Sequence, residues 1–194
     1  MPQDELGVRV VSSRPAGSLV ARRTFAVALG ALLVALAAQV VVPVPFSPVP
    51  MTLQPLAVLV VGGLLGTAGG LAALILYLVL GILGLPVFAP GGAPGILRLV
   101  GPTGGYLLAF PIAAALTGAL VGRAPRSVLR VLLACALGMV IIHIGGVAQL
   151  ALLGGDPALA FRVGFIPFLT GDLLKIGLAV ALIMLAGRKI RSLL

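Results

Sequence analysis

The chain has 194 residues, of which 61% are hydrophobic and 9% are charged, and its mean hydropathy is +1.29. Soluble domains carry about 25% charged residues, so a water-soluble fold is excluded and we predict an all-α integral membrane protein. The net charge of +9 does not indicate nucleic-acid binding, because the basic residues lie at the ends of apolar segments and not among aromatic residues.

Six transmembrane helices are expected from the charge-free segments. The longest such segment runs over 74 residues, from Thr24 to Leu97, and one helical span needs roughly 20. The spans are expected at residues 24–42, then two within 52–85 that separate near 66–70, then at 102–122, 131–153 and 164–186. The chain therefore divides into an N-terminal tail (1–23), a six-helix membrane domain (24–187) and a basic C-terminus (188–194).

The basic residues predict the orientation in the membrane. With the N-terminus in the cytoplasm, ten basic residues lie inside, two (Arg98 and Arg162) lie outside, and Lys175 lies within a span. Cytoplasmic loops carry such an excess, and it arises here only if residues 52–85 cross the membrane twice. Both termini are thus expected in the cytoplasm. The ten inside residues are Arg9, Arg14, Arg22, Arg23, Arg123, Arg126, Arg130, Arg188, Lys189 and Arg191.

Motifs for catalysis or nucleotide hydrolysis are missing from the sequence. It contains no phosphate-binding Gly-x-x-x-x-Gly-Lys-Ser/Thr loop, and its single histidine, His143, excludes His-based metal clusters. His143 lacks a sequence neighbour to complete a relay, so a hydrogen bond between helices is the simpler interpretation. We expect a protein that is not an enzyme and has no metal or cofactor.

Asp172 and Lys175 are the outstanding pair, because ionisable residues inside a span are costly and normally mark a functional site. Their i, i+3 spacing places both on one helical face, and Gly171 leaves space beside them. The alternative is a structural ion pair that joins the last span to its neighbours.

Two proline- and glycine-rich segments lie between spans on the predicted outer side. Residues 43–55 form a stiff loop that brings the uncharged polar groups of Thr52 and Gln54. Residues 84–98 suit a lid over a ligand and end at Arg98, after which a helix start near Thr103 offers free N–H groups to an anion. Either segment is equally well explained as a rigid turn or an ordinary surface loop.

A face of alanines runs along the first span. Small residues let transmembrane helices approach closely, so this face is a candidate docking surface for another membrane protein, although an alanine-rich chain also produces such spacing by chance. The alanines are Ala28, Ala31, Ala35 and Ala38.

Four motifs together resemble the BioY family, the biotin-binding S components of energy-coupling factor (ECF) vitamin transporters. The resemblance implies a six-helix fold and a biotin pocket that opens outward in a bacterial cell membrane. It also implies a T component and two ATPase subunits as partners, docked through Ala31 and Ala35. Membrane lipid, and a second copy of the chain, are further expected partners. The motifs are Pro50-Met-Thr-Leu-Gln-Pro-Leu56, Gly84-Leu-Pro-Val-Phe88, Gly101-Pro-Thr-Gly-Gly-Tyr106 and Gly171-Asp-Leu-Leu-Lys175.

The resemblance implies a biotin site around Gln54, Asp172 and Lys175, with Arg98 and Tyr106. Biotin offers two ureido N–H donors, a ureido carbonyl, an apolar ring and a carboxylate. Asp172 suits the donors, Lys175 the carbonyl, and Arg98 or the helix start at Thr103 the carboxylate. The remaining predicted contacts are Phe88 and Tyr77 as ring walls, with Thr52 and Gly92. The alternatives are a small intramembrane enzyme and a structural membrane partner that use the Asp172–Lys175 pair.

Overall fold

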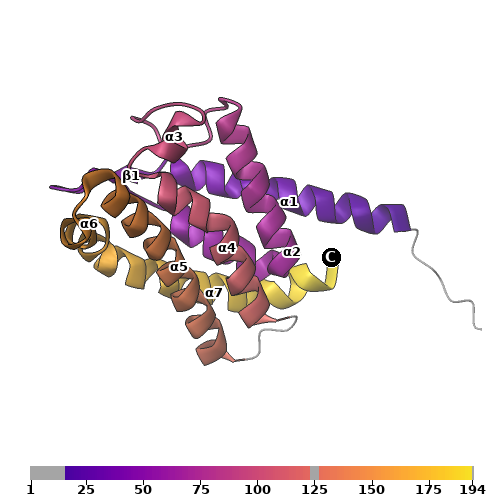
Figure 1. The fold of residues 1–194 in the computed structure, drawn as a ribbon. Coiled ribbons are helices and arrows are strands. Elements are labelled where there is room, and N and C mark those ends of the chain that lie inside the picture. Colours follow the sequence, from indigo (N-terminus) through magenta and orange to yellow (C-terminus); the bar gives the residue numbers. More distant parts are fainter. Residues whose placement is uncertain (1–15, 123–126, 194) are drawn as a thin grey trace, which may run out of the picture.

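The computed structural model describes residues 16–122 and 127–193, and these form an almost entirely helical bundle (Figure 1). This confirms the all-α prediction. Two short strands and a 3₁₀ turn, η1 (Ile166–Phe168), complete the described part. The helices are α1 (Ala16–Ala38), α2 (Gln54–Ile82), α3 (Leu97–Val100), α4 (Gly104–Val121), α5 (Val128–Gly154), α6 (Pro157–Gly164) and α7 (Leu169–Leu193).

Five helical segments of the described chain are long and apolar enough to cross a membrane, and one of them, α2, doubles back on itself. The reversal lies at Gly66, whose φ of 78° and ψ of −176° suit glycine. Gln54 and Tyr77, 23 residues apart, are hydrogen-bonded, whereas a straight helix would separate them by roughly 34 Å. The two halves of α2 therefore supply two passes, and the six-helix prediction is confirmed.

The first helix differs in its bounds from the expected span. It begins at Ala16 and ends at Ala38 instead of extending to residue 42. The next residues form an antiparallel pair, β1 (Val41–Val42) with β2 (Met51–Thr52), in which Val41 faces Thr52. The prolines between the strands cannot continue a helix, and the hairpin brings Thr52 directly before the start of α2.

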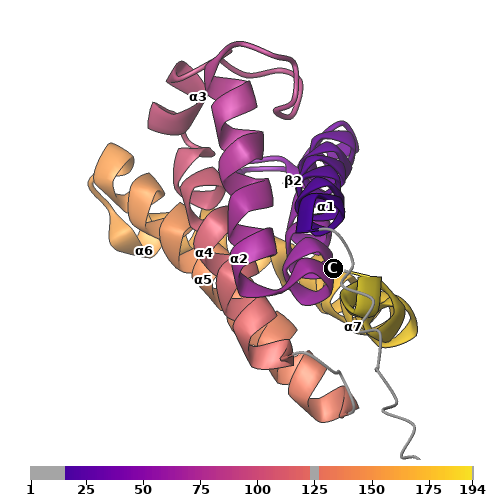
Figure 2. The same cartoon turned by 90° about the vertical axis from the view of Figure 1, so that its right-hand side faces the viewer.

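Close helix contacts in the centre of the bundle depend on glycine. A side chain at Gly62 of α2 would overlap the backbone of Ala114 in α4, and one at Gly105 of α4 would overlap the backbone of Gly145 in α5. Small residues at such crossings let transmembrane helices approach closely. The stack α2–α4–α5 results, and Figure 2 shows α1 and α7 on one side of it.

Three of the four alanines in the predicted docking surface on α1 are buried within the chain. Ala28 is exposed, but Ala31, Ala35 and Ala38 are at most 9% exposed and belong to the core. On the same face, a Cβ at Gly30 would lie 3.0 Å from the Cβ of Ala73 in α2. The spacing correctly identified a close-packing face, but that face is used inside the chain, against α2.

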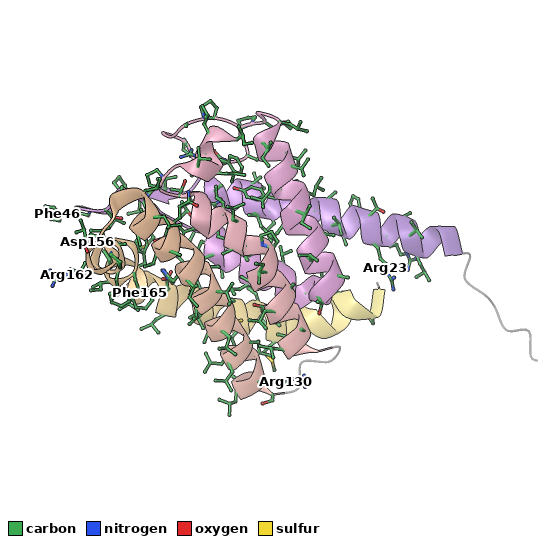
Figure 3. The ribbon with its side chains drawn as sticks, viewed as in Figure 1. Arg23, Phe46, Arg130, Asp156, Arg162 and Phe165 are labelled. Atoms are coloured by element: carbon green, nitrogen blue, oxygen red, sulfur yellow. The ribbon has the colours of Figure 1, made fainter. Side chains whose placement is uncertain are left out.

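The outer surface of the bundle is apolar. Large side chains such as Phe25 (65% exposed), Leu173 (70%) and Leu185 (82%) point outward. Charged side chains gather at the two ends, where Figure 3 shows Arg23 and Arg130 opposite Asp156 and Arg162. An apolar band between polar ends is what a bilayer requires.

Candidate substrate-binding site

A cavity of about 60 Å³ lies at the end of the bundle that carries the β1–β2 hairpin, α3 and α6. Both predicted loop segments and the helices α2, α3, α4, α5 and α7 contribute to its wall, so residues far apart in sequence meet here. Its lining comprises Val49, Pro50, Thr52, Gln54, Pro55, Phe88, Ala89, Arg98, Thr103, Tyr106, Leu107, Phe110, Ile142, His143, Phe168, Asp172 and Lys175.

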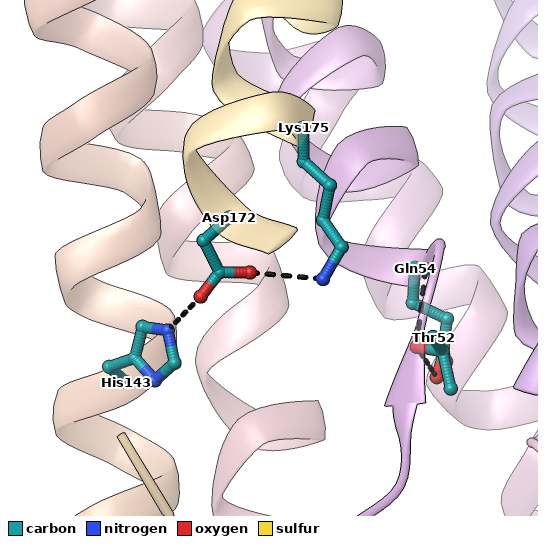
Figure 4. Close-up of polar contacts among 5 residues, drawn as sticks. All are labelled: Thr52, Gln54, His143, Asp172 and Lys175. Atoms are coloured by element: carbon teal, nitrogen blue, oxygen red, sulfur yellow. Dashed lines mark hydrogen bonds and ion pairs between the residues drawn. The ribbon is translucent and has the colours of Figure 1, made fainter. Parts of the chain in front are cut away.

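A buried polar triad forms one side of the cavity (Figure 4). Asp172 lies in the first turn of α7, with Lys175 one turn later on the same face. Its carboxylate accepts from Lys175 Nζ at 3.0 Å on Oδ1 and contacts His143 Nε2 of α5 at 2.6 Å on Oδ2. All three residues are at most 7% exposed. Such burial is tolerable because the carboxylate and the ammonium neutralise each other.

Gln54 forms a second polar position, at the start of α2. Its Nε2 donates to the Tyr77 hydroxyl at 2.5 Å, and its Oε1 accepts from Thr52 Oγ1 at 3.1 Å. Tyr77 lies behind Gln54, is fully buried and packs edge-on against Phe88 with ring centroids 5.5 Å apart. Tyr77 therefore supports the cavity wall without lining it.

Arg98 of α3 is the cation of the loop side. Its Nη2 donates to the Ala89 carbonyl, its Nε has no partner, and no carboxylate within residues 16–122 and 127–193 pairs with it. Burial lowers the pKa of the Arg98 guanidinium from its ordinary value, an effect that Tyr77 partly opposes. An arginine nevertheless keeps its charge in proteins. The cavity thus contains one uncompensated positive charge.

Aromatic side chains complete the wall between these polar positions. Tyr106 of α4 donates from its hydroxyl to the Gly164 carbonyl at 2.6 Å, which joins α4 to the end of α6. Its ring lies 6.5 Å from that of Phe168, and Phe88 lines the cavity from the linker. The arrangement suits a ligand with an apolar centre, a neutral hydrogen-bonding group and a negative end.

Eight of the ten predicted substrate contacts line this one cavity. The two that do not are Tyr77, which supports Gln54, and Gly92. Gly92 lies in the linker on the other side of Arg98, where a side chain would overlap the guanidinium. The eight are Thr52, Gln54, Phe88, Arg98, Thr103, Tyr106, Asp172 and Lys175.

Nine of the seventeen lining residues were not predicted as substrate contacts, and His143 is the one among them with a polar side chain. The expected hydrogen bond between helices is confirmed, but its partner is Asp172 and the ring lines the cavity. The available signal was its position as the one residue of the Asp, Glu, Lys, Arg and His types between 131 and 155, since such residues inside a span mark functional sites.

Comparison with known proteins identifies the family. The BioY family model matches residues 9–192. The chain is 39% identical over 160 residues to the "Probable biotin transporter BioY" of Pyrococcus horikoshii, which covers 82% of this chain and 93% of that protein. It is 41% identical over 149 residues to the "Biotin transporter BioY" of Thermotoga maritima, covering 76% and 85%.

The fold is also found in a solved structure. The crystal structure of the S-component for biotin from an ECF-type ABC transporter matches with a TM-score of 0.80 and 24% identity, over 93% of this chain and 95% of that one. The likeness at this identity concerns the fold. Together with the match of the family model along nearly the whole chain, it establishes that this protein belongs to the BioY family.

Proposed function

We propose that the chain is a membrane-embedded substrate-binding subunit that captures biotin from outside the cell and delivers it inward. One observation carries the proposal. The same cavity is lined by the buried, charge-compensated triad of His143, Asp172 and Lys175 and by the guanidinium of Arg98, which has no counter-charge among the described residues. Relatives at 39% and 41% identity are named as biotin transporters, which supports biotin as the ligand.

Each chemical part of biotin has a counterpart in the cavity. The ureido group is neutral, so it suits the charge-compensated side, where Asp172 accepts from N–H groups and Lys175 donates to the carbonyl. Tyr106, Phe168 and Phe88 suit the apolar ring. The carboxylate goes to Arg98, because Lys175 is already paired with Asp172 at 3.0 Å and a guanidinium binds a carboxylate well.

The cavity opens toward the outside in this proposal, with both termini in the cytoplasm of a bacterial cell. Four described cations belong to the helix ends opposite the hairpin and α3 (Figures 1 and 3), namely Arg22, Arg23, Arg130 and Lys189, whereas Arg98 and Arg162 lie at the cavity end. Positive charge concentrates on the cytoplasmic side of membrane proteins. The same assignment makes residues 1–23 and 188–194 the cytoplasmic ends of a membrane domain at 24–187.

Cysteine labelling tests this orientation. In a Cys135→Ser background, cysteines that replace Ser47 and Gly92 should react with an impermeant thiol reagent on intact cells, and one that replaces Ser127 should react after lysis alone. A labelled position 127 on intact cells contradicts the orientation.

A T component and two ATPase subunits are the proposed partners, and the fold shared with an ECF-type S-component supports this. Co-expression with such a module should raise the uptake of labelled biotin above that of the chain by itself. Equal uptake in both strains contradicts an energising role of the module. Because Ala31, Ala35 and Ala38 are buried, the proposed partner would contact a different surface of α1.

Calorimetry on the purified protein tests the function. Protein from biotin-free medium should bind biotin with one-to-one stoichiometry, and protein from biotin-containing medium should release unmodified biotin, detected by mass spectrometry. No heat of binding contradicts the proposal and favours a structural partner protein. Chemically altered biotin contradicts it in favour of an intramembrane enzyme.

A further inference from the structure

His143 is the single histidine of the chain, and its two ring nitrogens are in different surroundings. Nε2 lies 2.6 Å from Asp172 Oδ2. A carboxylate accepts hydrogen bonds, so Nε2 is the nitrogen that carries the proton. Nδ1 is buried and has no partner within the described residues. The imidazole is therefore a one-sided donor directed at Asp172.

The position of the imidazole is determined by packing against aromatic rings. Phe165 packs edge-on at a centroid distance of 4.9 Å, and Tyr106 does so at 6.1 Å. Phe168 lies 6.1 Å away at 51°. These rings come from α4 and from the segment between α6 and α7, so the imidazole is held from elements other than its own. These ring contacts hold the imidazole in addition to its bond with Asp172.

Lys175, the other partner of Asp172, restricts the orientation of the carboxylate much less. Lys175 is three residues away on the same helix, and its ammonium ends a flexible stem that follows the carboxylate into several rotamers. His143, on α5, binds the opposite oxygen of the carboxylate and so restricts its rotation (Figure 4). The titratable groups that face His143 are Asp172, Lys175 and Tyr106, and the Tyr106 hydroxyl is already used by the Gly164 carbonyl.

We infer that His143 is a positioning residue, which holds the Asp172 carboxylate in the one orientation that leaves acceptor lone pairs for the N–H groups of the ligand. The inference rests on the proposed function, because the ligand donors are those of the biotin ureido group. Without the His143 donor, the carboxylate rotates onto Lys175 and its acceptors are withdrawn from the cavity.

Two amide substitutions separate the donor from the bulk of the ring. The amide nitrogen of His143→Gln takes a place close to that of Nε2, whereas the shorter side chain of His143→Asn corresponds to Nδ1. His143→Asn removes the hydrogen bond to the Asp172 carboxylate. Because a hydrogen bond to a charged group is strong, this loss should weaken biotin binding roughly tenfold or more. His143→Gln should retain most of the affinity.

A double-mutant cycle distinguishes positioning from a general structural role. In an Asp172→Asn background, His143→Asn should change the biotin affinity by less than about twofold, because residues that act through one another are not additive. A purely structural role predicts the same further loss in both backgrounds and no rescue by His143→Gln. Either of these results overturns the inference.

Selective ¹⁵N-histidine labelling tests the geometry without ligand. In protein without a histidine tag, a single imidazole contributes to the spectrum, and the proton should be on Nε2. A proton on Nδ1 overturns the inference by itself. Absence of biotin binding by the wild-type protein contradicts the proposed function instead, so the two failures are distinguishable.

Discussion

The two walls of the cavity hold their charges in different ways. On the helix wall, formed by α5 and α7, Asp172 is bonded to both Lys175 and His143, and all three side chains are buried. On the loop wall, formed by the 84–98 segment and α3, Arg98 is half-buried and bonded to a backbone carbonyl. The helix wall is compensated and rigid, whereas the loop wall carries net charge on a segment without long helices.

This difference assigns separate tasks to the two walls. A compensated, desolvated wall recognises a neutral group through the direction of its hydrogen bonds, and a half-buried cation without a counter-charge attracts an anionic end. The cavity of about 60 Å³ is also smaller than typical ligand pockets of roughly 300 Å³ or more. We therefore expect the loop wall to move when a ligand enters, because its backbone is joined to the bundle by few hydrogen bonds.

The largest effect is expected on the helix wall. Asp172→Asn leaves Lys175 buried without its counter-charge, and breaking such a pair costs about 3–5 kcal/mol. Biotin binding should weaken roughly a hundredfold or more by calorimetry, and Lys175→Ala should act similarly. Asp156→Asn is the matched control, because Asp156 caps the exposed start of α6 and Asn caps equally well. Unchanged affinity in both cavity variants would remove the pair from the site.

Arg98→Gln tests the loop wall and should have the next largest effect. Loss of a charged hydrogen-bond partner should weaken biotin binding roughly tenfold or more. Biotinamide, which has no carboxylate, should bind the variant and the wild type equally. Arg162→Gln is the control, since Arg162 lies on α6 outside the cavity. An equal loss for both ligands would assign the carboxylate to another group.

A smaller effect is expected from Gly92→Ala, measured by the same calorimetry. The added Cβ would overlap the Arg98 guanidinium, which is the far end of a flexible side chain and moves at little cost. Affinity for biotin should fall about threefold, a part of the Arg98→Gln effect, with an unchanged unfolding temperature. Ala93→Ser, on the neighbouring exposed residue, should bind normally. A lowered unfolding temperature in Gly92→Ala would instead indicate a backbone role.

The smallest effect on affinity is expected from Gln39→Ala. Gln39 Nε2 donates to the carbonyls of Pro86 and Phe88 at 3.5 and 3.4 Å, and so joins α1 to the loop wall. Its removal should change affinity less than about twofold, because such long bonds are weak. Hydrogen–deuterium exchange of residues 84–96 should become faster, while exchange in α7 stays the same. Faster exchange in both residues 84–96 and α7 would contradict the expectation that the loop wall moves without the helix wall.

Local signals were sufficient for much of the site. Asp172 and Lys175 were identifiable because a charge inside a span is unusual, and Gln54 and Arg98 because they lie where apolar segments meet loops. His143 was not placed in the site, because its partner is 29 residues away and the crossing of α5 with α7 decides the contact. Tyr77 was predicted to line the cavity, but it lies behind Gln54. Aromatic character by itself does not indicate whether a ring contacts the ligand or supports the residues that do.

The sequence by itself determined the membrane fold and the number of passes, including the reversal near Gly66, because hydropathy, charge and glycine act over a few neighbouring residues. Only the tertiary structure decided the use of the alanine face on α1: Ala31, Ala35 and Ala38 permit close packing against any helix, and here that helix is α2. Likewise, only the way the helices cross places Asp172 between the donors of His143 and Lys175 and leaves Arg98 without a carboxylate partner among the described residues. Such pairings depend on distances between segments that no local pattern records.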